Sequence, residues 1–210
     1  MDGFQRRKER KKENIRRAAF ELFSAYGVQK VSISEIAEKA NVSQVTIYNY
    51  FGSKDGLLQD VIVDCMNKGW QEYRELVESD IAFPEMIDQF INEKTQFTGV
   101  LNPEFLQSFI SNDPEIRRVV EEQFQTHGLP VLLKLIEKGK SQGYINQDIS
   151  VEAILKYIHM FKEAKYRLDT LSDDPKRNLR LSRELSALFF YGLMGKPANG
   201  GRQNDQAGRQ

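Results

Sequence analysis

The chain has 210 residues, of which 40% are hydrophobic and 29% are charged, a composition typical of a soluble globular protein with a sizeable core. No apolar run reaches the roughly 20 residues that a membrane-spanning helix needs, and the basic N-terminus lacks the apolar stretch of a signal peptide. The single cysteine, Cys65, cannot form an intrachain disulfide, so we expect a cytoplasmic protein. The 30 Lys and Arg balance 30 Asp and Glu, and this net charge of zero would alone argue against a nucleic-acid partner.

The positive charge is nevertheless concentrated near the N-terminus, where residues 5–17 hold eight Lys or Arg against two Glu. Such a segment can follow DNA phosphates, although for Arg6–Arg10 taken alone a solvated arm is an equally good interpretation. From about Lys11 to Tyr26 the hydrophobic residues recur at helical spacing, which predicts an amphipathic helix ended by Gly27. Its inward face should consist of Ile15, Ala18, Ala19, Leu22, Phe23 and Tyr26.

The stretch from Ser32 to Lys54 predicts two short helices joined by a tight turn, with a third helix beginning at its end. Ser32 and Glu35 have the spacing of a capping box, so the first helix should begin near Ile33. Its apolar face would be formed by Ile33, Ile36, Ala37 and Ala40.

The turn and the second helix carry equally local signals. Asn41 tolerates the left-handed conformation in which helices often end, and Ser43 can cap a helix over residues 44–51. Ile47 and Phe51 lie one turn apart and should face inward.

The opposite face of this second helix carries Val45 and Asn49, flanked by Thr46, Tyr48 and Tyr50. A surface of hydroxyls, phenols and an amide with almost no charge fits a helix in the DNA major groove better than a merely solvated helix. We expect base-edge contacts from Ser34, Gln44, Val45 and Asn49. Contacts to the DNA backbone are expected from Ser32, Thr46, Tyr48, Tyr50 and Lys54.

These residues carry a family resemblance. The runs S-I-x-E-I-A-x-x-A-x-V-S and T-I-Y-N-Y-F-x-S-K resemble the DNA-binding signature of TetR-type (TetR/AcrR) bacterial transcriptional regulators. The signature covers about the first quarter of the chain, and the remainder resembles the family only in its helical layout. The resemblance implies a homodimeric, ligand-responsive DNA-binding protein, usually a repressor.

The remaining chain predicts more helices. The first, from Lys54 to about Glu78, would link the DNA-binding unit to everything downstream as a mechanical lever. Cys65 lies in its apolar stripe and is expected to be a small buried hydrophobe rather than a redox sensor. Pro130 should kink or interrupt the chain at His127–Pro130. The other helices are expected over residues 84–98, 103–111, from 114 to that interruption, and over 131–142, 151–170 and 175–194.

The middle region is rich in phenylalanine, which suits either a cavity for a small apolar ligand or an ordinary helical core. The kink at His127–Pro130 favours a cavity there, although a lone histidine such as His127 is more often a hydrogen-bonded core residue. The candidate ligand-binding residues are Trp70, Phe97, Phe105, Phe109, Phe124, His127, Tyr157 and Phe161.

The last two helices, over about residues 151–194, should form a four-helix bundle with their mates in a homodimer, as the resemblance implies. The alternative is that they only cover the core of a monomer. The final helix carries a predicted apolar stripe of Leu181, Leu185, Leu188, Phe189 and Gly192.

We therefore expect an all-α protein with a helix-turn-helix DNA-binding domain over residues 1–53, of which 1–10 form a basic arm. A helical ligand-binding and dimerisation domain would follow over 54–196, and a disordered tail over 197–210. No phosphate-binding loop, metal-ligand cluster or acid–base constellation is evident, so we expect neither an enzyme nor a cofactor.

The predicted function is a regulator, most often a repressor, released from a palindromic operator by a small, largely apolar ligand. An activator or effector-independent regulator is one alternative, and a helical protein-interaction module without specific DNA binding is another.

Overall fold

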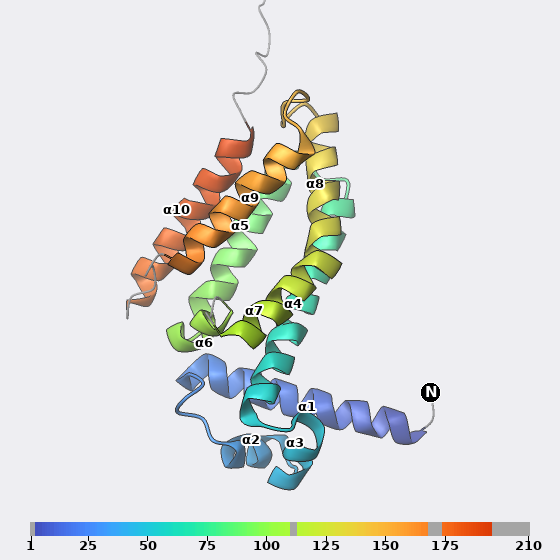
Figure 1. The fold of residues 1–210 in the computed structure, drawn as a ribbon, viewed down its shortest axis with the longest axis vertical. Coiled ribbons are helices and arrows are strands. Elements are labelled where there is room, and N and C mark those ends of the chain that lie inside the picture. The colour runs from blue at the N-terminus through green and yellow to red at the C-terminus, as the bar shows by residue number, and fades with distance from the viewer. Residues whose placement is uncertain (1–2, 110–112, 168–173, 195–210) are drawn as a thin grey trace, which may run out of the picture.

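The computed structural model describes residues 3–109, 113–167 and 174–194, and every regular element within these ranges is a helix (Figure 1). The predicted all-α class is confirmed. None of the helices in these ranges is long and apolar enough to cross a membrane. The predicted tail over 197–210, and the expected extensions of two helices to Ser111 and Thr170, lie outside the described residues.

The helices follow one another along the chain with short connections. Their bounds are α1 Gly3–Tyr26, α2 Ile33–Ala40, α3 Gln44–Phe51, α4 Lys54–Glu78, α5 Phe83–Val100, α6 Pro103–Ser108, α7 Pro114–Gln123, the π-helical turn η1 Phe124–Gly128, α8 Leu129–Ser141, α9 Val151–Arg167 and α10 Pro175–Met194.

The short helices α2 and α3 begin and end where local side-chain chemistry places them. Ser32 and Glu35 form the predicted capping box, in which the Ser32 hydroxyl accepts from the Glu35 N–H at 3.2 Å. Asn41 ends α2 in the left-handed region, with φ of 53°. The Ser43 hydroxyl accepts from the Thr46 N–H at 3.2 Å and so caps α3. The boundaries of α2, α3 and α4 therefore agree with the sequence prediction.

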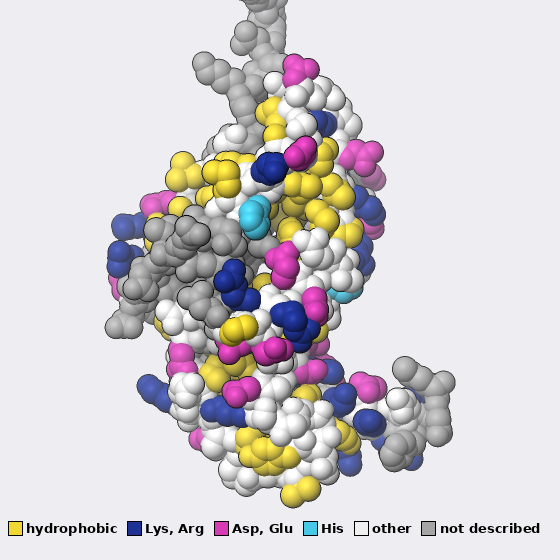
Figure 2. Space-filling model, in the orientation of Figure 1, with side chains coloured by type: hydrophobic (Ala, Val, Ile, Leu, Met, Phe, Trp, Pro, Cys, Tyr) yellow, Lys and Arg dark blue, Asp and Glu magenta, His cyan; other side chains and the backbone are white. Residues whose placement is uncertain are grey.

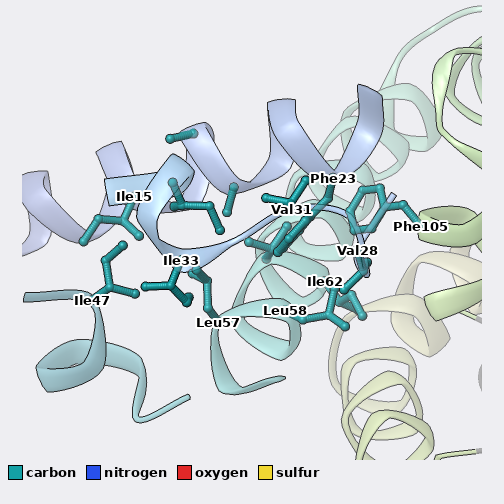
Figure 3. Packing of buried hydrophobic residues seen from close by; sticks show 14 of the residues in the cluster. Ile15, Phe23, Val28, Val31, Ile33, Ile47, Leu57, Leu58, Ile62 and Phe105 are labelled. Atoms are coloured by element: carbon teal, nitrogen blue, oxygen red, sulfur yellow. The ribbon is translucent and has the colours of Figure 1, made fainter. Parts of the chain in front are cut away.

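A first hydrophobic core joins α1, α2 and α3 to the beginning of α4. Figure 3 shows the labelled side chains of this core converging from α1, α2, α3, α4 and α6 and from the segment between α1 and α2. Those with no exposed surface include Ile15, Phe23, Ile47, Leu57, Ile62 and Phe105. The predicted inward face of α2, Ile33, Ile36, Ala37 and Ala40, is buried in the same core.

A second core lies among α5, α8, α9 and α10, at the other end of the molecule in Figure 1. Phe83, Met86 and Ile154 are among its buried members. The C-terminal part of α4 enters this core through Val77. One helix thus runs from the first core into the second.

The structure corrects two expectations for α1. The helix begins at Gly3 rather than near Lys11, because the basic residues of the predicted arm are themselves good helix formers. Tyr26, expected on the inward face, is 60% exposed, since it is the last residue of α1 and lies beyond the packed part of the helix.

The predicted interruption near Pro130 is a π-helical turn rather than a break. The Leu129 N–H donates to the Phe124 carbonyl, and α8 continues directly from η1 with Pro130 in its first turn. The wider turn accommodates a residue that has no N–H and whose ring would otherwise meet the carbonyl of the preceding turn.

We expect Phe105→Ala to destabilise the protein by about 3–5 kcal/mol, because its ring is fully buried and packs within 6 Å of the rings of Phe23 and Phe20. Urea unfolding would measure this loss. Tyr26→Ala is the control, and it should change the free energy of unfolding by no more than about 0.5 kcal/mol, since that ring is mostly in solvent. Equal losses in the two variants would contradict this assignment of the core.

Candidate nucleic-acid interface and ligand cavity

The outward face of α3 carries the side chains that the sequence predicts for base contacts. Val45 is 65% exposed, and Gln44 and Asn49 are exposed on either side of it. Ile47, on the opposite face, is fully buried. At the lower end of the molecule, which α2 and α3 form in Figure 1, Figure 2 shows a surface with few charged side chains.

The residues of α3 that are predicted to contact the DNA backbone differ in their exposure and in the contacts that their side chains already make. Tyr48 is 48% exposed. Tyr50 is half-buried, and its ring meets that of Phe51 edge-on with centroids 6.3 Å apart. The Thr46 hydroxyl lies 2.8 Å from the Ser43 hydroxyl. Tyr48 is therefore the freest of the three, while Tyr50 also belongs to the packing of α3.

The beginnings of α2 and α4 lie beside each other at this surface. The Glu35 carboxylate accepts from both the backbone N–H and the hydroxyl of Ser32, each at 2.7 Å. These hydrogen bonds hold the pKa of Glu35 below its usual value, and the positive charge of Lys54 acts in the same direction. Ser34 is exposed on the first turn of α2. The structure thus places Lys54 near the capped beginning of α2, which carries Ser32 and Ser34.

The N-terminal part of α1, residues 5–12, is called the basic segment here. It holds six Lys or Arg and one Glu. In Figure 1 it projects beyond the body of the molecule at the end that carries α2 and α3, and Figure 2 shows its Lys and Arg side chains on the surface. The predicted positive region therefore lies near the outward face of α3. It forms part of a helix rather than an arm.

Arg16 belongs to a contact between helices rather than to this free positive surface. Its Nε donates to the Asp60 carboxylate of α4 at 2.5 Å, and its guanidinium also lies 3.2 Å from the Glu13 carboxylate. Lys68 of α4 lies 3.4 Å from Glu13 and 2.7 Å from Asp64. These ion pairs tie α1 to α4.

An apolar cavity of about 390 Å³ lies between α4, α5, the α7–η1–α8 run, α9 and α10. Trp70, Phe124 and Phe161, which the sequence predicts as ligand-binding residues, line it together. No charged side chain of the described residues lines this cavity. Its size and apolar walls are those of a small-molecule site.

A second cavity of about 440 Å³ lies between α1, α4 and α5, and shares Met66, Trp70 and Tyr73 with the first. The predicted residues Phe97 and Phe109 lie here, with ring centroids 6.2 Å apart. Its walls also carry charged side chains, including those of the ion pairs between α1 and α4.

Three predicted ligand-binding residues line neither cavity. Phe105 is fully buried in the first core, because α6 packs against α1 rather than against the second core. His127 is half-buried in η1. Tyr157 stacks on Phe189 with centroids 5.5 Å apart. Helical periodicity identifies Phe105 as inward-facing, but it does not tell which core this residue enters.

The sequence reasoning missed part of the cavity wall. Phe90, Phe189 and Phe190 line it, and the burial of Tyr73 within this wall raises its pKa to about 12. The adjacent Phe189 and Phe190 are the signal that could have identified α10 as a wall of the cavity as well as a surface helix.

Cys65 lies in the wall of the second cavity. Burial raises the pKa of its thiol to about 12, so the thiol stays protonated at neutral pH. Because the thiolate is the reactive form, this agrees with the predicted role as a small hydrophobe.

The outer surfaces of α9 and α10 expose large apolar side chains. Met160 is 69% exposed and Leu188 is 66% exposed. In α10 the buried side is formed by Ser186, Phe189 and Phe190, so the predicted apolar stripe is divided between two faces. Leu188 lies on the exposed face, whereas Phe189 and Phe190 pack against the second core.

Comparisons with known proteins agree with this architecture. The family model of "Bacterial regulatory proteins, tetR family" matches residues 15–61. The HTH-type transcriptional regulator YvdT of Bacillus subtilis is 34% identical over 83 residues, which are 40% of this chain and 43% of YvdT. YdgC, an HTH-type transcriptional regulator of the same organism, is 24% identical over 193 residues, covering 88% of this chain and 93% of YdgC.

A solved structure extends the comparison to the whole fold. The crystal structure of Thermus thermophilus FadR, a TetR-family transcriptional repressor in complex with lauroyl-CoA, matches with a TM-score of 0.58 and 25% identity. The match covers 90% of this chain and 100% of that one. Residues 15–61 match the TetR family of bacterial transcriptional regulators, and the whole chain, with its capped helix-turn-helix and the helical bundle behind it, is similar in fold to members of that family.

Proposed function

We propose that this regulator is a homodimeric repressor that binds a palindromic operator and leaves it when a small apolar ligand enters the cavity behind α4. The observation that carries the proposal is the exposed, uncharged face of α3, held by two caps and by the burial of Ile47. A helix with such a face can enter the major groove, where hydrogen-bonding and apolar groups distinguish base pairs.

On this face we assign base-edge contacts to Gln44, Val45 and Asn49, with Ser34 from α2. The exposed Val45 side chain suits the methyl group of thymine, and the Asn49 amide suits an adenine edge. Backbone contacts are assigned to Ser32, Thr46, Tyr48, Tyr50 and Lys54. The basic segment of α1 adds attraction to phosphates that does not depend on base sequence.

A dimer is supported by the apolar side chains that α9 and α10 expose. Met160 and Leu188 are each about two-thirds exposed, and an apolar patch built from these two helices would mark an interaction surface. A symmetric dimer through these helices would present two copies of α3 to a palindrome, with half-sites about 34–36 Å apart for one helical turn.

Ligand control is assigned to α4, because this helix belongs to both cores and lines the apolar cavity. A ligand that favours one tilt of α4 would change the separation of the two α3 helices. It can do so only if it binds the two tilts with different affinity. The division of the chain at residue 53 stays a prediction, since the first turns of α4 pack with α1–α3.

Relatives support repression rather than activation. KstR2 of Rhodococcus jostii and NicS of Pseudomonas putida, 20% and 26% identical to this chain, are HTH-type transcriptional repressors. Selection of genomic DNA fragments by the purified protein, followed by footprinting, tests the proposal. A palindromic footprint is expected, whereas the absence of any enriched sequence would indicate a protein-interaction module instead.

We expect Asn49→Ala and Lys54→Ala to weaken DNA binding in different ways. Asn49→Ala should relax the preference at one base pair, with a loss of about 1–3 kcal/mol on the selected site. Lys54→Ala should weaken binding to all sequences alike and make the logarithm of the affinity fall less steeply with salt. Titrations at several salt concentrations on selected and scrambled sites would measure both effects, and equal effects of both variants on every site would contradict this division of roles.

We expect Leu188→Asp to convert the dimer into a monomer, because it places a charge in the proposed apolar interface. Sedimentation equilibrium would measure the oligomeric state. Leu133→Asp is the matched control, since Leu133 is 40% exposed on α8, outside the two helices of the proposed interface, and it should leave the dimer intact. A dimeric Leu188→Asp variant would contradict the assignment of the interface to α10.

A further inference from the structure

We propose that the indole of Trp70 donates a hydrogen bond to an acceptor atom on an uncharged, otherwise apolar effector in the 390 Å³ cavity. This inference rests on the proposed function, since it concerns the ligand that would release the DNA. It names the chemistry of that ligand and the side chain that recognises it.

The first step is the indole N–H itself. Nε1 of Trp70 is buried and meets no hydrogen-bond acceptor among the described residues. An indole nitrogen can only donate, and a buried donor without an acceptor costs free energy in a folded protein. Buried tryptophans usually have a partner for this group, so an unpaired one in a cavity wall indicates that its acceptor comes from a ligand.

The second step is that the indole is held firmly. A Cβ atom at Gly128 would lie 2.7 Å from Cζ2 and 2.9 Å from Cη2 of Trp70, so only glycine lets η1 approach the ring this closely. The rings of Phe124 and Tyr73 lie 6.1 Å and 5.9 Å from it. Cζ2 and Nε1 are attached to the same ring atom. The donor therefore belongs to a part of the ring whose position is already fixed by packing, which reduces the ordering cost of ligand binding.

The third step is the chemistry of the cavity. Its lining within the described chain consists of apolar and aromatic side chains, and Trp70 and Tyr73 carry the only polar side-chain groups. A charged group packed against these walls would lose hydration without gaining a counter-charge from them. A water molecule needs two to four polar partners, and this wall is poorly suited to supply them. A neutral ligand with a carbonyl, ester or ether oxygen satisfies the indole at the least cost.

The fourth step connects recognition to regulation. Trp70 is part of α4, whose earlier residues Leu57 and Ile62 are fully buried in the core of the DNA-binding unit. A ligand that binds the indole therefore acts on the lever helix directly. This placement makes Trp70 a recognition residue on α4, the helix whose tilt is proposed to change.

The experiment uses the full-length protein and three probes of equal length: methyl nonyl ketone, the alkene in which a methylene group replaces its carbonyl oxygen, and the undecanoate anion. Calorimetry would give the affinity of each probe for the wild type and for Trp70→Phe, which keeps an aromatic ring but removes the donor. Trp70 is the only tryptophan, so the fluorescence of the wild type reports occupancy of this wall.

We expect the wild type to bind the ketone about three- to tenfold more tightly than the alkene, and Trp70→Phe to lose this preference while keeping its affinity for the alkene. Phe161→Leu is the matched control: it alters the same cavity without touching the donor and should weaken both probes alike.

A ketone preference that survives in Trp70→Phe would overturn the role of Trp70, and tightest binding of the anion would overturn the uncharged class. Failure of both neutral probes to bind would also overturn the inference. None of these results depends on DNA, so failure to find an operator in the fragment selection would reject the proposed function separately.

Discussion

The burial of α4 in two separate cores is the constraint on which the rest of the structure depends. Leu57 and Ile62 fill the first core, and Val77 enters the second. Each fully buried aliphatic side chain contributes about 1.5–3 kcal/mol, whereas ion pairs that are partly in solvent, such as that of Arg16 with Asp60, contribute about 0–1 kcal/mol. Apolar burial therefore fixes the DNA-binding unit on α4, and the ion pairs adjust its orientation. A tilt of α4 would therefore change the packing in both cores.

The outward face of α3 is held in place because capping and packing stabilise a helix that would not persist alone. An isolated helix as short as α3, with eight residues, is unstable in water. The Ser43 cap and the burial of Ile47 stabilise it, and the same burial determines that Val45 and Asn49 face outward. The residues proposed to recognise DNA are thus placed by residues that are not expected to contact it. Changes in the core would alter DNA binding indirectly, which is why core and surface variants need separate readouts.

The sequence predicts the features that depend on neighbouring residues and misses those that depend on distant ones. Ser32 and Asn41 define α2 through hydrogen bonds and backbone angles within a few residues, so its boundaries are predictable. The core entered by Phe105 depends on how α6 packs against α1, and periodicity holds no information on that. The stripe of α10 shows a related limit: the helix has two apolar faces, so the single predicted stripe through Leu188 and Phe189 joins residues that lie on different faces.

The two faces of α9 and α10 also link ligand binding to dimerisation. Phe161 and Phe189 line the cavity, while Met160 and Leu188, which are their immediate neighbours in sequence, face outward. A ligand that shifts either helix therefore shifts the surface proposed to meet the partner subunit. By linkage, assembly of the dimer must change the affinity for the ligand by the same factor by which the ligand changes assembly. In the proposed dimer, an effector bound in one subunit would then bias the tilt of α4 in both, as the release of both half-sites of a palindrome would require.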